Sequence, residues 1–223
     1  MKRPLLVLIF LSAHTGCVHT PADESTSDNA ASSGDSKAQT FVYECPGDYS
    51  FVARIETGKA WLFLPGNTVD LPPQASASGS QYSNGSTVFR RQGDTAMVET
   101  GTGRHSGCRN NRAKAIWEHA KLNGVDFRAT GNEPGWYMEI SNKTDILLVT
   151  DYGQNTSRFE SSTMTSEAHS RTTVFNARNH NDRVEVVITG KPCTDSMSGE
   201  AFTATVSVLI NNRKYQGCGR ALH

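Results

Sequence analysis

Apolar and polar positions alternate over short segments through most of the chain from residue 40 onward. In residues 51–56, Phe51, Ala53 and Ile55 recur at every second position, which predicts a strand with one buried face. Residues 60–64 are apolar throughout and predict a strand that is covered on both sides. Turns rich in Gly, Pro and Asn separate these segments. The pattern favours a small antiparallel barrel or sandwich for residues 40–112.

A loop of small residues interrupts the strand pattern within this first half. Residues 76–80 read Ser-Ala-Ser-Gly-Ser and carry no bulky side chain, so they cannot contribute to a core. The pair Asn84-Gly85 then lies between two strand-like runs and predicts a hairpin with a type I′ turn, because both residues tolerate positive φ. We expect the small-residue loop to enter a narrow cleft of another molecule.

Helical spacing is confined to residues 113–124, between two β-rich parts. Asn110-Asn111 offers an N-cap and Gly124 a stop. The apolar residues at helical spacing are Ala113, Ile116, Trp117 and Ala120. Strand patterns resume at residue 125 and include a ten-residue alternation over residues 201–210. The chain is therefore predicted to be all-β, with a small barrel (40–112), a short connecting helix (113–124) and a second β-rich domain (125–223).

The N-terminus has the features of an export signal. Lys2-Arg3 precedes an apolar run, Leu5 to Leu11, that is too short to span a bilayer. Thr15-Gly16-Cys17 resembles a bacterial lipobox, with His14 where Leu is usual, so residues 1–17 are predicted as a lipoprotein signal peptide with lipid (palmitate) at Cys17. A plain secretory signal is the alternative. Val18 is not Asp, so the inner-membrane retention signal is missing, and we expect an outer-membrane lipoprotein that faces the periplasm.

Residues 18–39 consist mostly of Ser, Asp, Ala, Thr and Gly. Such a segment cannot bury enough apolar surface to offset its ordering entropy. We interpret it as a flexible linker between the lipid anchor in the membrane and the folded part.

Cysteines support an exported protein. The chain has five cysteines, and if Cys17 takes lipid, four remain; exported proteins usually pair them. Four cysteines allow three connectivities. The local pairs Cys45–Cys108 and Cys193–Cys218 would give each half its own crosslink, worth about 3–4 kcal/mol each. A zinc site is the alternative, but no Cys-x-x-Cys or close Cys/His pair supports it.

Charge and histidine spacing exclude several classes of function. Acidic and basic residues balance at 22 each, and there is no basic stripe, so we predict no nucleic-acid partner. The histidines at positions 105, 119, 169 and 180 show no ligand spacing and are predicted at the surface. The sequence therefore predicts no metal and no cofactor.

A series of motifs in the first half carries a resemblance to a known family. These motifs are Tyr43-x-Cys45, Ala75-Ser76-Ala77-Ser78-Gly79-x-x-Tyr82-x-x-Gly85, Val88-Phe89, Gly93-Asp94-x-Ala96 and Cys108. With them, the first half resembles the domain of the membrane-bound inhibitors of C-type lysozyme (MliC/PliC), which are periplasmic or lipid-anchored proteins of Gram-negative bacteria. The resemblance covers about a third of the chain.

This resemblance implies an eight-stranded antiparallel barrel closed by the disulfide, and a way of binding. The serine before the glycine, here Ser78, would enter the lysozyme cleft and bind the catalytic acids. A lysine fourteen residues later is the second inhibitory residue of the family, and here that position is Gln92. The expected binding residues are Ser78, Gly79, Tyr82, Gln92 and Arg91. Because Gln92 brings no charge, we expect weaker inhibition or a different lysozyme target.

The second half resembles an uncharacterised domain of bacterial exported lipoproteins, which is sometimes fused to lysozyme-inhibitor domains. The motifs are Phe127-Arg128-Ala129-x-Gly131-Asn132-Glu133-Pro134-Gly135-Trp136, Cys193-x-Asp195-x-Met197-Ser198 and Gly217-Cys218. The resemblance implies β structure and an envelope location but no activity. Glu133 and Asp195 are the polar residues of interest; acid–base chemistry or a cation site is one interpretation, and capping of loops is the simpler one.

The sequence thus predicts a lipid-anchored periplasmic inhibitor whose protein partner is C-type lysozyme. The alternative is a non-inhibitory envelope module that binds a glycan, a lipid or an envelope partner through residues 125–223. An enzyme is not predicted, because a serine hydrolase would need a base near Ser78 and no histidine stands in a recognisable constellation with it.

Overall fold

The computed structural model describes residues 38–160 and 162–223. The expected signal peptide, Cys17 and nearly all of the expected linker lie outside the described residues. In the part of the chain that is described, no helix is long and apolar enough to span a bilayer.

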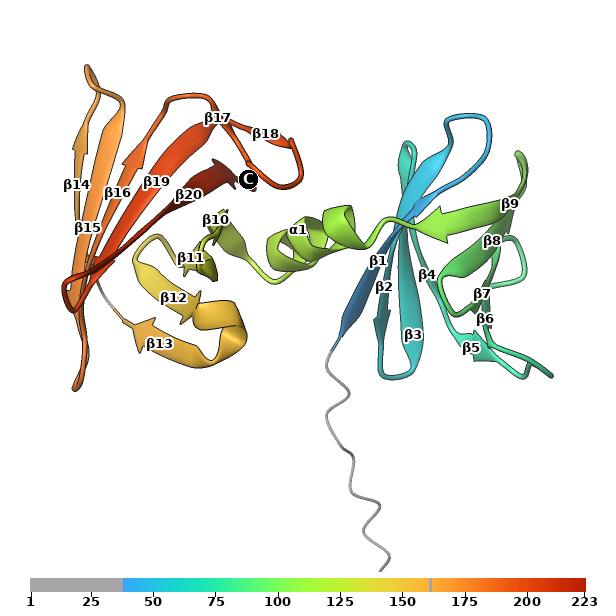
Figure 1. Ribbon diagram of the computed structural model, residues 1–223. Helices are drawn as coiled ribbons and strands as arrows, with labels where there is room; N and C mark the ends of the chain where they lie inside the picture. Colours follow the sequence, from blue (N-terminus) through green and yellow to red (C-terminus); the bar gives the residue numbers. More distant parts are fainter. Residues whose placement is uncertain (1–37, 161) are drawn as a thin grey trace, which may run out of the picture. The chain divides into compact units, whose positions relative to one another are not determined.

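The first β-rich part is a single antiparallel sheet, called sheet A here. Within the described residues its nine strands have the order β4-β3-β2-β1-β9-β8-β7-β6-β5 (Figure 1). The strands are β1 (Gln39–Glu44), β2 (Ser50–Glu56), β3 (Lys59–Leu64), β4 (Asn67–Leu71), β5 (Pro73–Gln74), β6 (Ser80–Ser83), β7 (Val88–Gln92), β8 (Thr95–Thr100) and β9 (Gly103–Asn110).

Sheet A curls into a barrel that the chain itself closes. The two ends of the sheet, β4 and β5, are consecutive and are separated only by Pro72. The Ser83 amide donates to the Pro72 carbonyl at 3.0 Å, which holds the break against β6. If β4 and β5 are taken as one strand interrupted at Pro72, the described part of sheet A has the eight strands of the expected barrel. The predicted fold class is confirmed.

The barrel core is built from the alternating apolar positions. Tyr43, Phe51 and Phe89 are buried and form an aromatic cluster with ring centroids 5.3–5.9 Å apart. Leu62 and Leu71 are also fully buried. Each such side chain contributes about 1.5–3 kcal/mol relative to an exposed position. Two cysteines, Cys45 and Cys108, form a disulfide that joins the segment after β1 to β9.

The hairpin at residues 80–92 is present, but its turn differs from the predicted one. Ser83 pairs with Val88, and the Asn84 amide donates to the Thr87 carbonyl, so Gly85 and Ser86 are the central residues. Gly85 has φ +92°, whereas Asn84 does not adopt positive φ. Asn84 instead accepts from the Ser86 and Thr87 amides through its Oδ1. The type I′ prediction was wrong because the asparagine side chain closes the turn from the first position.

The helix α1 (Arg112–Leu122) follows β9. Asn111 is its N-cap and accepts from the Lys114 amide at 3.1 Å, as the sequence indicated. Trp117 and Ala120 are buried, but Ile116 is 52% exposed. The expected apolar face was therefore wrong at Ile116 and at Ala113, which is also exposed, whereas Ala115 is buried.

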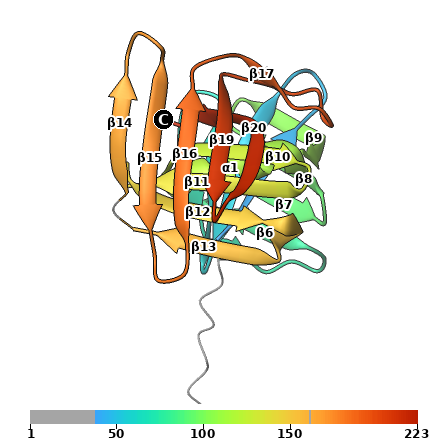
Figure 2. The same cartoon turned by 60° about the vertical axis from the view of Figure 1, so that its left-hand side comes forward.

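The second β-rich part is another antiparallel sheet, sheet B, which also curls (Figure 2). Its strand order in the described residues is β13-β12-β11-β10-β20-β19-β16-β15-β14. The strands are β10 (Val125–Asn132), β11 (Gly135–Ser141), β12 (Asp145–Thr150), β13 (Asn155–Phe159), β14 (Thr163–Glu167), β15 (Thr172–Arg178), β16 (Arg183–Thr189), β19 (Ala204–Ile210) and β20 (Arg213–Ala221). The 3-10 turn η1 (Asp151–Gly153) joins β12 to β13.

A small hairpin, β17 (Cys193–Thr194) with β18 (Ala201–Phe202), lies between β16 and β19. The Cys193–Cys218 disulfide ties this hairpin to β20. Sheet B has its own core, which includes Met138, Leu148 and Val208. The sequence did not predict β14, because its residues are all exposed and show no apolar alternation.

Candidate functional site

The Ser78 loop, defined here as residues 75–79, connects β5 to β6 and is exposed along its whole length. β5 and β6 pair directly below it, with Gln74 opposite Gln81. Ser76 Oγ donates to the Ser78 carbonyl at 2.7 Å. This bond shapes the loop from within and leaves the Ser78 side chain at the surface. The loop is thus a short projection on a paired base.

Gly79 makes a close backbone approach at this base. It has φ +68°, and a β-carbon added to it would lie 2.3 Å from the carbonyl oxygen of Arg91 and 3.5 Å from Gln92 Cα. A side chain cannot be placed there. Only glycine therefore allows the backbone at the start of β6 to lie this close to the end of β7. This contact also brings Ser78 and Gln92, two of the expected binding residues, to the same edge of the barrel.

The three residues at the end of β7 alternate between the outside and the inside of the barrel. Gln92 and Arg90 are exposed, and Arg90 Nε donates to Gln81 Oε1 at 2.7 Å. Arg91 lies on the same side as buried Phe89 and holds its guanidinium 4.3 Å from the centroid of the Phe41 ring. Arg91 therefore lies at the end of the barrel, where its Nη2 also donates to the Gly93 carbonyl at 3.2 Å.

Buried polar atoms accompany Arg91. Among the described residues, Arg91 Nε and Tyr43 Oη are buried side-chain atoms that lack a hydrogen-bond partner. Burial raises the pKa of the Tyr43 hydroxyl, and the nearby Arg91 charge opposes that rise. This pair belongs to the packing of the barrel end.

Tyr82, another expected binding residue, serves the core as well as the surface. Its ring stacks on Phe89 with centroids 6.0 Å apart, and its backbone pairs with Pro73 and with Phe89. Because the side chain is half-buried, Tyr82 anchors β6 beneath the loop.

An ion pair that the sequence did not indicate lies just after Gln92. Asp94 accepts from the Arg112 guanidinium and, at 3.4 Å, from Asn110 Nδ2. The hydrogen bond from Arg112 lowers the pKa of the Asp94 carboxyl. The pairing offsets the one acidic charge in the turn that follows Gln92. The turn that follows Gln92 therefore carries no unpaired carboxylate.

The two carboxylates of interest in the second half, Glu133 and Asp195, have different environments. Glu133 is exposed in the β10–β11 turn. Asp195 is buried and accepts from the Met197 and Ser198 amides, the Ser198 hydroxyl and Asn132 Nδ2, the last at 2.7 Å. These bonds, led by that from the Ser198 amide, lower its pKa. Asp195 is thus a loop cap, the simpler of the two interpretations.

Sheet B also carries a largely buried ion pair that the sequence did not reveal. Arg128 on β10 is 9% exposed and pairs with Glu139 directly opposite on β11. Its guanidinium lies 4.5 Å from the centroid of the Tyr137 ring. Burial lowers the pKa of Arg128, and Glu139 counteracts this. Only the strand register could have shown that these residues face each other.

The expected surface histidines include two that make specific contacts. His105 stacks on Tyr49 with ring centroids 3.5 Å apart. His119 Nδ1 lies 3.0 Å from Thr40 Oγ1, and its Nε2 lies 2.9 Å from Asn123. In residues 38–160 and 162–223 no group of three or more His, Cys, Asp or Glu side chains is arranged to hold a metal ion.

One comparison with known proteins gives a match within the first half. Residues 43–106 match the model of the MliC family, described as membrane-bound lysozyme inhibitor of c-type lysozyme. The match confirms the resemblance predicted from the motifs, and its range includes the Ser78 loop, Tyr82 and Gln92. The family is one of inhibitors and not of enzymes. The curated proteins and the solved structures contain no match to the chain.

Proposed function

We propose that this chain inhibits c-type lysozyme in the bacterial envelope by inserting the Ser78 loop into the active-site cleft of the enzyme. The observation that carries the proposal is the position of the loop: within a segment that matches the inhibitor family, it is exposed, free of bulky side chains and held on a fixed base. A preformed loop loses little conformational entropy when it binds.

The serine hydroxyl suits the chemistry of such a cleft. Retaining glycosidases hold two carboxyl groups about 5–5.5 Å apart. One hydroxyl oxygen placed between them can lie at about 2.7 Å from each, which is a normal O–H···O hydrogen-bond distance. It donates to the carboxylate and accepts from the protonated acid. Ser78 would thereby occupy both catalytic groups without offering a bond to cleave.

The surrounding residues set the strength of binding. Gln92 can donate hydrogen bonds from its amide, but a charged donor forms bonds roughly twice as strong. The Arg91 charge is directed to Phe41 at the barrel end. We infer that this chain binds more weakly than a lysine-bearing relative, with the loop and a rim together burying roughly 1,600 Å² in total.

The membrane anchor is part of the same proposal. Lipid on Cys17 would hold the chain at the outer membrane, and residues 18–39 would give the barrel reach into the periplasm. Metabolic labelling with palmitate tests the anchor: the wild-type chain should incorporate label and the Cys17→Ser variant should not. Labelling of the variant would disprove the assignment.

The inhibition itself is tested with the full-length chain in mild detergent and a c-type lysozyme acting on cell walls. Micromolar chain should slow the enzyme, and Ser78→Ala should weaken inhibition about tenfold, which corresponds to about 1.4 kcal/mol. The control is Ser86→Ala, an exposed serine in the turn at the other end of β6. Full lysozyme activity in the presence of the chain at micromolar concentration would refute the proposal.

A binding module in the second half is the alternative, and one observation favours it. A cavity of about 400 Å³ in sheet B is lined by Thr130, Trp136, Tyr137, Tyr152 and Met197, among others. Tyr152 and Met197 are 75% and 77% exposed, which is unusual for large apolar side chains. Soluble glycan fragments of the envelope should quench the fluorescence of Trp136 if this cavity binds them; unchanged fluorescence at millimolar fragment would exclude that ligand.

A further inference from the structure

The two sheets have the same strand order. If the separate β17–β18 hairpin is set aside, β10 to β13 take the places of β1 to β4, and the remaining strands of sheet B take the places of β5 to β9. In both sheets the first strand pairs with the last: Tyr43 with Asn110 in sheet A, and Phe127 with Ala221 in sheet B. Each connection of sheet A therefore has a counterpart in sheet B.

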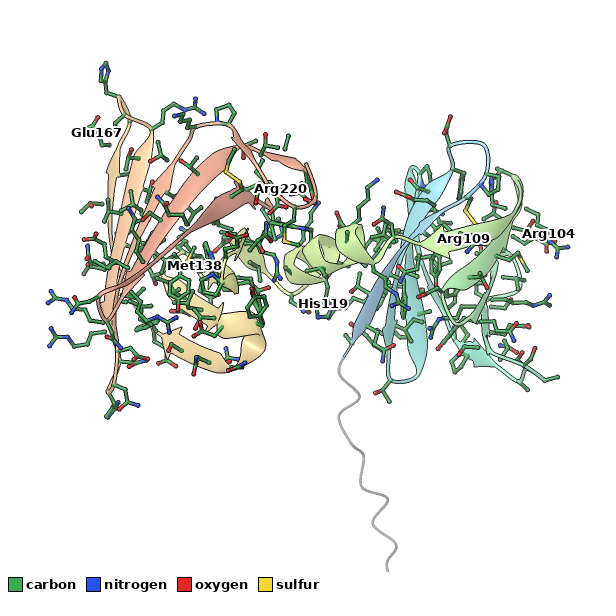
Figure 3. All side chains as sticks on the ribbon, in the orientation of Figure 1. Arg104, Arg109, His119, Met138, Glu167 and Arg220 are labelled. Carbon is green, nitrogen blue, oxygen red and sulfur yellow. A yellow bond between two sulfur atoms is a disulfide. The ribbon has the colours of Figure 1, made fainter. Side chains whose placement is uncertain are left out.

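The counterpart of the Ser78 loop is the connection from β14 to β15, residues 168–171, with the sequence Ala-His-Ser-Arg. All four residues are exposed, as are the residues of the Ser78 loop. The last of them, Arg171, also accepts a backbone hydrogen bond from Gly190. Glu167, the last residue of β14, lies at the projecting end of this hairpin (Figure 3).

The two loops have a similar backbone conformation at their last residue. The residue before the sixth strand has positive φ in both, +68° at Gly79 and +53° at Arg171. The residue before that is a serine in both, Ser78 and Ser170. Ser170 therefore occupies the position in sheet B that Ser78 occupies in sheet A.

A glycine also lies at the base of the second loop, but it is across from the loop and faces the Arg171 side chain instead of a backbone carbonyl. Gly190, at the end of β16, donates its amide to the Arg171 carbonyl at 2.8 Å. A β-carbon on Gly190 would lie 2.9 Å from Arg171 Nε. In sheet A the glycine is in the loop and Gln92 is across from it. In sheet B the glycine, Gly190, is across from the loop. The loop position itself is therefore free to hold a charged residue, Arg171.

The charges around Ser170 favour an acidic partner. Arg171 is in the loop and Lys191 follows Gly190, whereas Glu167 is the acidic neighbour and accepts from the His169 amide. Arg171 thus supplies, one residue after Ser170, the positive charge that Gln92 does not supply near Ser78.

We propose that residues 168–171 form a second insertion loop, with Ser170 as the hydroxyl and Arg171 as the cation, and that it binds the carboxylate-lined cleft of a second c-type lysozyme molecule. This rests on the proposed function, because it takes the loop-insertion mode from the first sheet. A hydroxyl beside a guanidinium offers a carboxylate a hydrogen bond and a charge-assisted one.

Isothermal titration of the full-length chain with a c-type lysozyme at low ionic strength tests the proposal. Two lysozyme molecules should bind per chain. Arg171→Gly, which suits the positive φ, should weaken one of the two sites about five- to tenfold, and Ser170→Ala should weaken the same site. The matched control is Arg183→Ala, which removes an exposed arginine at the opposite end of β16.

The outcomes separate the two proposals. If one lysozyme binds and only Ser78→Ala weakens it, the second loop is refuted and the proposed function stands. If Arg171→Gly weakens binding and Ser78→Ala has no effect, the second loop stands and the role of Ser78 is refuted. Absence of any binding overturns both.

Discussion

The carbonyl oxygen of Arg91 lies 2.3 Å from the position that a β-carbon on Gly79 would occupy. This contact joins the end of β7 to the base of the Ser78 loop. The loop therefore depends on a glycine for two reasons, the positive φ and the lack of space.

Replacement of Gly79 by alanine should displace the loop. Alanine at positive φ costs about 1–2 kcal/mol, and the clash with Arg91 adds to that cost. We expect a lower melting temperature and loss of most lysozyme inhibition, measured by thermal unfolding and by cell-wall lysis.

The control for this substitution is Gly85→Ala in the β6–β7 turn. Gly85 also has positive φ, +92°, but an added β-carbon would meet no atom within 4 Å. It should share the conformational cost and keep inhibition. Equal losses of inhibition in the two variants would show that the Arg91 contact does not position the loop.

Gln92→Lys should strengthen inhibition. A charge-assisted bond to a carboxylate gains about 1 kcal/mol over a neutral one, which corresponds to about fivefold in the inhibition constant. The gain should shrink as salt rises, because the side chain is exposed. Thr102→Lys adds the same charge in the β8–β9 turn, at the other end of β8, and should change little. An unchanged inhibition constant for Gln92→Lys would place position 92 outside the contact.

Asp195→Asn should destabilise the chain at neutral pH but not in acid. The pKa of Asp195 is lowered in the folded state, so its stabilising effect is complete above the ordinary aspartate pKa, near 4. That effect is lost as pH falls through the lower folded pKa. Loss of one charged hydrogen bond costs about 1.5–3 kcal/mol. Denaturant unfolding from pH 7 to pH 2 measures the difference, with the exposed Asp48→Asn as control; a difference that persists at pH 2 would contradict this linkage.

Glu139→Gln should destabilise sheet B through Arg128. Removal of one member of a largely buried ion pair leaves a poorly compensated charge, and we expect a cost of about 2–4 kcal/mol because Gln keeps a neutral acceptor. Chemical denaturation measures it. The control is Glu185→Gln, an exposed position on β16, and a cost no larger than that of the control would mean that Arg128 does not depend on the Glu139 charge.

Much of the architecture could be predicted from local patterns. The alternation at Phe51, Ala53 and Ile55 and the apolar run at 60–64 indicated the strands of the barrel, and the small residues around Ser78 indicated the loop. The N-cap at Asn111 was equally local. These features depend on neighbours in sequence, which is why the chain reveals them.

Features that depend on register could not be predicted. Arg128 and Glu139 are paired only once β10 and β11 are aligned, and the Gly79–Arg91 contact requires the closed base of the loop. The turn at Asn84 shows a local failure: a side-chain hydrogen bond shifted the turn by one residue. β14 was missed because an exposed strand has no apolar period to detect.

The break at Pro72 has a consequence for self-association. A curled sheet normally leaves two edges, and an exposed edge can recruit a strand from another chain. Here the edges β4 and β5 are consecutive along the chain, and Pro72 between them and Pro73 at the start of β5 have no amide hydrogen to donate. The barrel therefore offers a poor template for strand addition. This should keep copies of the chain from associating with one another through sheet A.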